Sequence, residues 1–260
     1  MPADIFYTGG TSHDHCQDYA FMNKKYDGFT LMALCDGCSS APHSEIGAIL
    51  VAHTSMRIQD LRREFSVSTI NDFVNYLSIS ATMINISYNC LAATLLCMEE
   101  YEDGVQVIMI GDGLIYGKRR DGSSILLKRM FPSGAPYYIY YHKSKELIDK
   151  YKKEFSLLSL YTSEEYNNDV SETSFSTNYN EELIYRKWFP REEFESVTLF
   201  TDGVLSFVPE QELIKVVREL TSFKNTTGHF LDRRVKRFLK ECSKENITHY
   251  DDLGLGTILL

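Results

Sequence analysis

The chain has 260 residues, of which 43% are hydrophobic and 24% are charged. This composition is typical of a globular protein with a substantial core, and it excludes disordered, collagen-like and coiled-coil chains. The net charge of −9 argues against nucleic-acid binding, which normally needs a basic surface. No apolar run approaches the roughly 20 residues of a membrane span, and the N-terminus lacks the pattern of a secretory signal. We therefore expect a cytoplasmic protein with no nucleic-acid or membrane partner.

The first half of the chain has the alternating apolar pattern of short strands. Strands are expected at residues 5–8, 19–24, 29–35, 92–98, 105–110, 114–119 and 124–128. Asp-Gly pairs at Asp27, Asp103 and Asp121 separate successive strands, and this dipeptide tolerates the positive φ angles of a tight hairpin. Two long helical patterns lie between the third and the fourth strand. The first half is therefore expected to form an antiparallel sheet with helices packed on it.

The second half is less regular. Residues 137–180 are rich in Tyr, Ser, Asn and Glu, and their only clear element is a short helix at about 145–155. We expect a variable flap or insert around residues 133–190, within a single domain spanning 1–260. A strand at 196–201, two helices and a last strand at 253–260 follow. The order of elements predicts an α+β sandwich in which two antiparallel sheets pack together with helices outside.

Several aspartates lie at the ends of the most apolar strands. Asp36, Asp112 and Asp202 each follow such a strand and precede glycine, Asp251 precedes the last strand, and Asp18 opens the second. Carboxylates in a partly dry site repel one another unless they meet a cation, and an all-oxygen site favours Mg²⁺ or Mn²⁺. Simple turns are the alternative. This alternative is weak for Asp36 and Asp202, because helical patterns follow them, but for Asp112 a hairpin fits equally well.

The segments that carry these residues resemble the motifs of metal-dependent protein phosphatases of the PPM (2C) family, most closely its compact bacterial branch. In chain order they are GTSHDHCQD, ALCDGCSSAPHSEIGA, MIGDGLIYG, TLFTDGV and DDLGLGTILL. The resemblance runs from about residue 9 to the end of the chain, apart from residues 133–190. It implies a PP2C-like fold with two central antiparallel β-sheets flanked by helices, in agreement with the order of elements above.

The resemblance also implies a reaction and a set of ligands. The reaction is hydrolysis of phosphoserine or phosphothreonine in proteins by a metal-bridging water, with two or three Mn²⁺ or Mg²⁺ ions as cofactors. Asp36 would bridge two ions and Gly37 would offer its carbonyl. Asp202 and Asp251 would complete the inner ligands, Asp18 would act through water, and Asp112 would help to hold a third ion. The partners implied are a phosphoprotein substrate and an opposing protein kinase.

Two positions depart from the family pattern. The family usually has a phosphate-binding arginine five residues before the first aspartate, and His13 stands there in this chain. Many members have a histidine after the second Asp-Gly, where this chain has Cys38. His43 lies further along and is a candidate general acid. A surface role remains the alternative for each histidine, so the group that binds phosphate stays open.

These departures keep two other functions open. A catalytically weak pseudophosphatase would keep the fold and recruit partners through the flap, and the missing arginine favours it. The intact set of aspartates argues against it, because an inactive site has no need for so many like charges. A metal-dependent phosphoesterase acting on small molecules is the third hypothesis.

Overall fold

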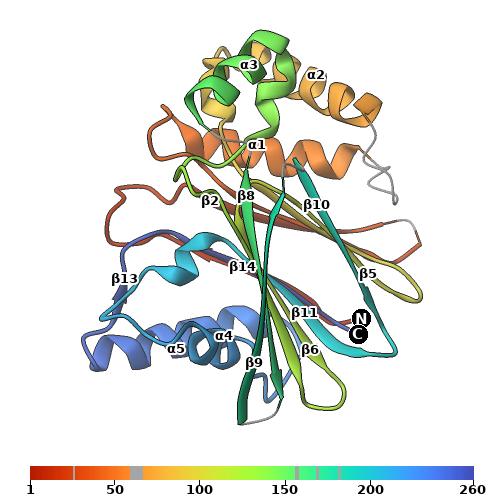
Figure 1. Cartoon of the computed structure of the whole chain (residues 1–260), viewed down its shortest axis with the longest axis vertical. Helices are drawn as coiled ribbons and strands as arrows, with labels where there is room; N and C mark the ends of the chain where they lie inside the picture. The colour runs from red at the N-terminus through yellow and green to blue at the C-terminus, as the bar shows by residue number, and fades with distance from the viewer. Residues whose placement is uncertain (26, 59–66, 156–157, 168–169, 181–182) are drawn as a thin grey trace.

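The fold is described from a computed structural model of the chain that covers residues 1–25, 27–58, 67–155, 158–167, 170–180 and 183–260. Two antiparallel β-sheets pack face to face (Figure 1). The smaller has the strand order β10-β5-β4-β3-β2. Its strands are β2 (Asp18–Lys24), β3 (Thr30–Asp36), β4 (Leu95–Glu100), β5 (Gly104–Ile110) and β10 (Ile184–Pro190).

The larger sheet has seven strands in the order β1-β14-β11-β6-β7-β8-β9. They are β1 (Ala3–Thr8), β6 (Gly113–Arg119), β7 (Ser124–Met130), β8 (Ser159–Asn167), β9 (Val170–Asn180), β11 (Phe194–Phe200) and β14 (Leu253–Leu259). β12 (Phe207–Val208) and β13 (Thr248–His249) form a third, two-stranded sheet that is not hydrogen-bonded to the other two. The first and last strands of the chain pair with each other along their whole length.

Helices cover the outer face of each sheet (Figure 1). The five-stranded sheet packs against α1 (Ser44–Arg57), α2 (Val67–Met83) and α3 (Lys145–Glu154), together with the 3₁₀ helices η1 (Tyr88–Leu91) and η2 (Ile139–Lys143). The seven-stranded sheet packs against α4 (Leu213–Leu220) and α5 (Phe230–Lys244). No helix in these described ranges has both the length and the hydropathy needed to cross a membrane.

The core has three apolar layers, because both sheets are buried on both faces. In β3, Met32 and Leu34 face the other sheet, while Ala33 and Cys35 face the helices. A strand buried on both faces is a continuous apolar run rather than an alternating one. The apolar strands that precede the aspartates are therefore the central strands of the sandwich.

The turn predictions have different outcomes. The Asp-Gly pairs at Asp27, Asp103 and Asp121 lie in the β2–β3, β4–β5 and β6–β7 hairpins, as predicted. The hairpin alternative for Asp112 is wrong, because β5 and β6 belong to different sheets. Gly111 and Gly113 on either side of Asp112 have φ values of 92° and 139°, which side chains rarely allow. Asp112 thus lies in a crossover between the two sheets.

The segment around residues 133–190 contains the expected helix, α3, and three strands that the sequence analysis did not predict. β8 and β9 extend the larger sheet, and β10 pairs with β5 at the edge of the smaller one. Part of the expected flap, at 156–157, 168–169 and 181–182, lies outside the described residues. The segment therefore contributes to both sheets.

Candidate metal centre

The predicted aspartates come from five strand ends at the same end of the sandwich. Asp18 and Asp36 are opposite each other in the β2–β3 pair. Asp202 begins η3 (Asp202–Leu205) directly after β11, and Asp251 lies just before β14, which pairs with β11. Asp112 lies in the crossover from β5 to β6. Asp18 is buried and the other four are partly exposed, so the carboxylates form an accessible cluster above a buried base.

The electrostatics show that these carboxylates converge. Burial raises the pKa of Asp36 well above its ordinary value, and the charges of Asp18, Asp202, Asp112 and Asp251 raise it further. Burial also raises the pKa of Asp18, although the Thr201 hydroxyl donates a 2.7 Å hydrogen bond to its Oδ2 and opposes the shift. Four carboxylates therefore act on Asp36, the residue at which the resemblance expects the bridging ligand.

Two further carboxyl groups titrate near neutral pH in the absence of a cation. Burial and the charge of Asp202 raise the pKa of Asp112 to about 8. Burial and the charge of Asp251 raise the pKa of Asp202 to about 6. Such shifts record the cost of bringing negative charges together without a counter-charge. A divalent cation removes that cost.

The donor set fits Mg²⁺ or Mn²⁺. Asp18 Oδ1 and Gln17 Oε1 are buried without a hydrogen-bond partner among the described residues. At Gly37 a Cβ atom would lie 2.7 Å from the Ser44 carbonyl oxygen, so only glycine fits there beside the start of α1. In the described part of the chain no three Asp, Glu, His or Cys side chains could hold an ion by themselves. Mg²⁺ usually keeps several waters and needs only one or two carboxylates, so this open arrangement suits it.

Asp252, which the sequence analysis did not single out from the Asp251-Asp252 pair, organises the loop before β2. Its buried carboxylate accepts hydrogen bonds from the backbone N–H groups of Gly10 at 2.7 Å and Gln17 at 2.6 Å. The Gln17 carbonyl in turn accepts the N–H of Gly37. One carboxylate therefore connects the loop of the first motif to the backbone of the second and to β14.

The two candidate histidines have different positions. His13 Nδ1 lies 3.1 Å from Asp252 Oδ2 and 3.8 Å from Asp251 Oδ1, so His13 lies at the acidic cluster. His43 is at the start of α1 with its side chain 68% exposed, and its Nδ1 lies 3.5 Å from Glu45 Oε1. Among the described residues the structure gives His43 no contact with the cluster, so geometry does not support the general-acid assignment.

Lys128 is a second residue that the sequence analysis missed. Lys128 of β7 is paired with Leu114 of β6, and Leu114 is paired on its other side with Phe200 of β11. Asp202 lies two residues after Phe200 in the chain. Directly opposed residues share a face of a sheet, so the Lys128 side chain leaves the sheet on the face of Leu114 and Phe200, which packs against α4 and α5. Its charge lowers the pKa of Asp202 in part, and burial lowers the pKa of Lys128 itself. Lys128 is therefore a half-buried cation beside the cluster.

Gly203 provides a test of how tightly the cluster is held. A Cβ atom at Gly203 would lie 1.6 Å from the carbonyl oxygen of Asp252. We expect Gly203→Ala to lower the free energy of unfolding by about 1–3 kcal/mol, the usual cost of overpacking, and to displace Asp202. Urea denaturation measures the loss. Gly9→Ala is the control, because its Cβ would be 3.6 Å from the nearest atom; equal effects of the two substitutions would contradict the expectation.

Comparison with known proteins agrees with this geometry. Residues 10–130 match the family model described as protein phosphatase 2C. The serine/threonine phosphatase Stp1 from Staphylococcus aureus superposes with a TM-score of 0.54 at 14% identity, over 100% of this chain and 95% of that one. Over residues 10–130 the chain is similar to the protein phosphatase 2C family. The family match covers the first two motifs and Asp112, and the superposition extends the fold over β11, η3 and β14.

Two further phosphatase structures give the same fold. The Mycobacterium tuberculosis serine/threonine phosphatase PstP/Ppp superposes with a TM-score of 0.54 at 11% identity, over 99% of this chain and 97% of that one. The PstP catalytic domain, solved with two manganese ions, gives a TM-score of 0.51 at 12% identity, over 98% and 96% of the two chains. No curated protein sequence matches the chain. At these identities the superpositions show the fold of these phosphatases, and the family match adds a sequence similarity over residues 10–130.

Proposed function

We propose that this protein hydrolyses phosphoserine and phosphothreonine in protein substrates with the help of Mn²⁺ or Mg²⁺. The proposal is supported by the pairing of Asp18 opposite Asp36 and by the charges of Asp112, Asp202 and Asp251, which all raise the pKa of Asp36. The PP2C match of residues 10–130 supports the reaction class. Its substrates would be cytoplasmic phosphoproteins, phosphorylated by an opposing protein kinase.

Asp36, Asp202 and Asp251 would hold the cations, and the Gly37 carbonyl would add a ligand. Asp18, which is buried below them, would bind a cation through a water molecule. Asp112 would help to hold a third ion. Two bound divalent cations would supply the Lewis acidity that lowers the pKa of a shared water and neutralises charge at phosphorus. The carboxylates orient the reaction, because they come from rigid strand ends rather than from a mobile loop.

Phosphate release from a phosphothreonine peptide tests the proposal. The assay is run with EDTA, with Mg²⁺ and with Mn²⁺, and Mn²⁺ binding is measured separately by isothermal titration calorimetry. We expect turnover only with a divalent cation. Folded protein that binds Mn²⁺ but releases no phosphate would overturn the phosphatase proposal and favour a scaffold. Release from nucleotides and sugar phosphates alone would favour the small-molecule phosphoesterase.

We assign the phosphate-binding cation to Lys128, which would replace the arginine usual at the His13 position. A lysine ammonium is a point charge that binds phosphate well, and this one is half-buried, with the charges of Glu164 and Asp202 acting on it. His13 faces Asp251 and Asp252, so its ring is engaged with carboxylates. Lys128 is therefore better placed to attract the negative phosphate of a substrate.

We expect Lys128→Met to raise KM for the phosphopeptide roughly tenfold, the equivalent of about 1.4 kcal/mol, with a smaller change in kcat. Lys118→Met is the matched control, because Lys118 is paired with Glu195 at 2.9 Å on the surface of β6. Steady-state kinetics of both variants gives the answer. An unchanged KM in Lys128→Met, with a raised KM in His13→Ala, would transfer the role to His13.

A further inference from the structure

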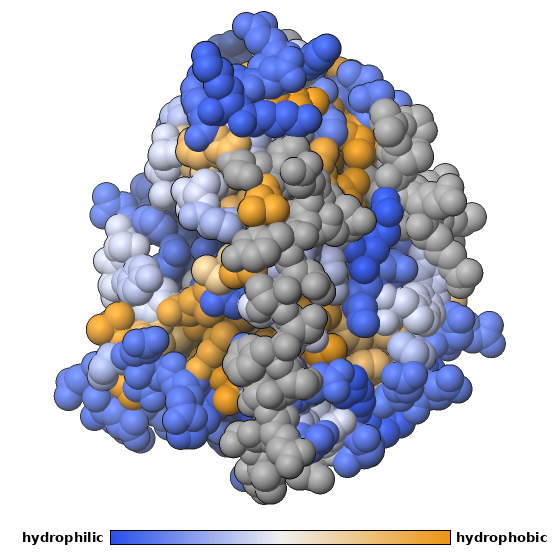
Figure 2. All heavy atoms as spheres, viewed as in Figure 1, coloured by the Kyte–Doolittle hydropathy of each residue, from blue (hydrophilic) through white to orange (hydrophobic). Residues whose placement is uncertain are grey.

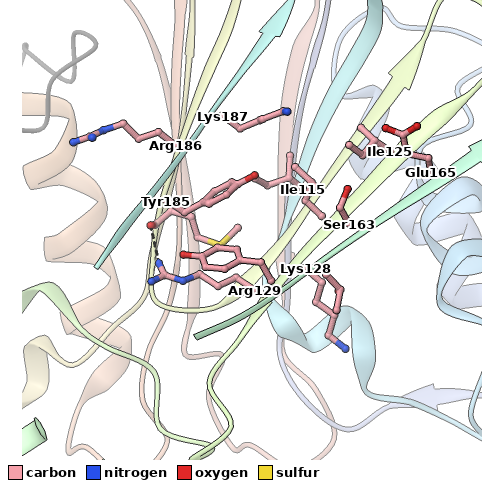
Figure 3. A pocket seen from close by; sticks show the side chains of 13 residues that line it. Ile115, Ile125, Lys128, Arg129, Ser163, Glu165, Tyr185, Arg186 and Lys187 are labelled. Atoms are coloured by element: carbon pink, nitrogen blue, oxygen red, sulfur yellow. Dashed lines mark hydrogen bonds between the residues drawn. The ribbon is translucent and has the colours of Figure 1, made fainter. Parts of the chain in front are cut away.

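A cavity of about 390 Å³ lies between strands of the two sheets (Figure 3). It is lined by residues of β5, β6, β7, β8 and β10. β10 is the edge strand of the smaller sheet, and β8 is next to the edge of the larger one. The volume lies within the roughly 300–1,000 Å³ of small-molecule sites.

The apolar part of the cavity comes from both sheets. Ile115, Ile125 and Leu127 on the larger sheet are buried and form its base. Tyr161 of β8 and Tyr185 of β10 are stacked with their ring centroids 4.9 Å apart, so one aromatic wall joins the two sheets. A flat or extended apolar group fits against such a surface.

The charged side chains that line the cavity carry a net positive charge. Successive side chains of β10 point to opposite faces of the sheet, so Lys187 lies on the same face as Tyr185 and Phe189. This face is the inner one, because Phe189 lies in the core between the sheets. In Figure 3 the Arg186 side chain extends in the opposite direction. Among the described residues that line the cavity, Glu165 is the one with a carboxylate. Its Oε1 lies 3.2 Å from Nη2 of Arg119. Lys187 therefore brings a positive charge to the cavity while the nearby carboxylate is paired elsewhere.

Arg129 adds a second cation at the inner end. It is 2% exposed, and its Nη1 donates hydrogen bonds to the carbonyl oxygens of Met109 at 3.1 Å and Leu183 at 3.2 Å. Ser163 of β8 contributes a hydroxyl to the lining. Arg129, which is buried and held by two carbonyl oxygens, and Lys187 of β10 thus border an apolar space.

We propose that this cavity binds a small amphipathic anion, with an aromatic or acyl body against Tyr161, Tyr185 and the aliphatic base, and a carboxylate or sulfonate on Lys187. The apolar base selects the body of the ligand, and the two cations select its charge. The inference goes beyond the proposed phosphatase function and does not depend on it, because its test measures binding alone and changes none of the five aspartates. Lys128, which also lines the cavity, is kept in every variant.

Titration with 8-anilinonaphthalene-1-sulfonate, an aromatic sulfonate, tests the site by fluorescence. We expect saturable binding to the wild-type protein and a roughly tenfold weaker affinity in Lys187→Glu, as expected when an attractive contact is replaced by a repulsive one. Ser163→Phe should abolish binding by filling the cavity. Lys152→Glu is the control, because it makes the same charge change on the exposed surface of α3.

Circular dichroism and thermal melting show whether each variant is folded. If Ser163→Phe does not fold, Lys187→Met provides the second test, with an expected loss of affinity between wild type and Lys187→Glu. Absence of saturable binding to the wild-type protein would overturn the proposal. Equal binding by wild type, Lys187→Glu and Lys152→Glu would also overturn it, and would assign the dye to another surface, such as the exposed Tyr76, Ile79 and Met83 of α2.

Discussion

Asp202→Asn is expected to remove the metal-dependent phosphatase activity while leaving the protein folded. Loss of a partner in the outer shell of a metal site typically costs 10- to 100-fold in activity or affinity. A direct ligand should cost more, so we expect kcat/KM to fall by more than about 100-fold. Asp202 is well suited to the test because its partly exposed side chain begins η3, and asparagine has nearly the same shape.

Asp103→Asn is the matched control for this substitution. Asp103 also precedes glycine, but it is exposed in the β4–β5 hairpin. Phosphate release from a phosphothreonine peptide in Mn²⁺, measured for both variants and wild type, should separate them clearly. Activity of Asp202→Asn within about threefold of wild type, less than 1 kcal/mol, would show that Asp202 is not a ligand.

The second large effect concerns the pH dependence of thermal stability. Without metal we expect the protein to become less stable as the pH rises, whereas the stabilisation by bound metal should increase. In the chelated protein the folded-state pKa values of Asp202 and Asp112, about 6 and about 8, lie above the ordinary value near 4. A raised carboxyl pKa means that the folded chain binds the proton more tightly than the unfolded chain. Its stabilising contribution is complete below about pH 4 and is lost as the pH rises through about 6 and then 8.

Metal binding reverses this trend, because ligands must lose their protons before they coordinate a cation. At 100 times the dissociation constant, Mn²⁺ should add about 2.7 kcal/mol, which for a chain of this size raises Tm by about 5–10 °C. Thermal melts from pH 5 to pH 8 in EDTA and in Mn²⁺ measure both effects. We expect Tm in EDTA to fall with rising pH and the increment from Mn²⁺ to grow.

A Mn²⁺ increment that stays constant from pH 5 to pH 8 would contradict this account. Asp202→Asn offers an internal check, because removing one charge relieves repulsion in the chelated protein. Its Tm in EDTA at pH 8 should equal or exceed that of wild type, while its increment from Mn²⁺ should be smaller. A variant that loses activity and also melts much earlier in EDTA would indicate a structural role instead.

The sequence pattern predicts the first half of the fold well, because its strands are central and apolar. The buried run of β3, with Met32 and Leu34 on one face and Ala33 and Cys35 on the other, is an unambiguous signal. The strands of the second half were missed for the opposite reason. The sequence of β8, SLYTSEEYN, is largely polar and only partly buried, so the alternation that marks a half-buried strand is weak.

The candidate site could be predicted for residues whose role depends on their position next to a strand in the sequence. An aspartate after an apolar strand is costly, and this cost identifies Asp36 and Asp202 from sequence alone. Asp252 was missed because its role depends on accepting N–H groups from Gly10 and Gln17, more than 230 residues away in the chain. Lys128 was missed because a lysine in a strand is usually an ordinary surface residue, and its electrostatic interaction with Asp202 depends on the three-dimensional fold.

The pairing of β14 between β1 and β11 has a consequence for folding during synthesis. The larger sheet needs residues 253–259 at its interior, so β1 and β11 each keep an unpaired edge until that segment has left the ribosome. Exposed edges of this kind invite pairing with other chains. Asp251 and Asp252 arrive with the same segment. The nascent chain therefore pairs β14 with β1 and β11 and brings Asp251 to the acidic cluster in one late event, and a chain cut short before β14 would aggregate rather than fold.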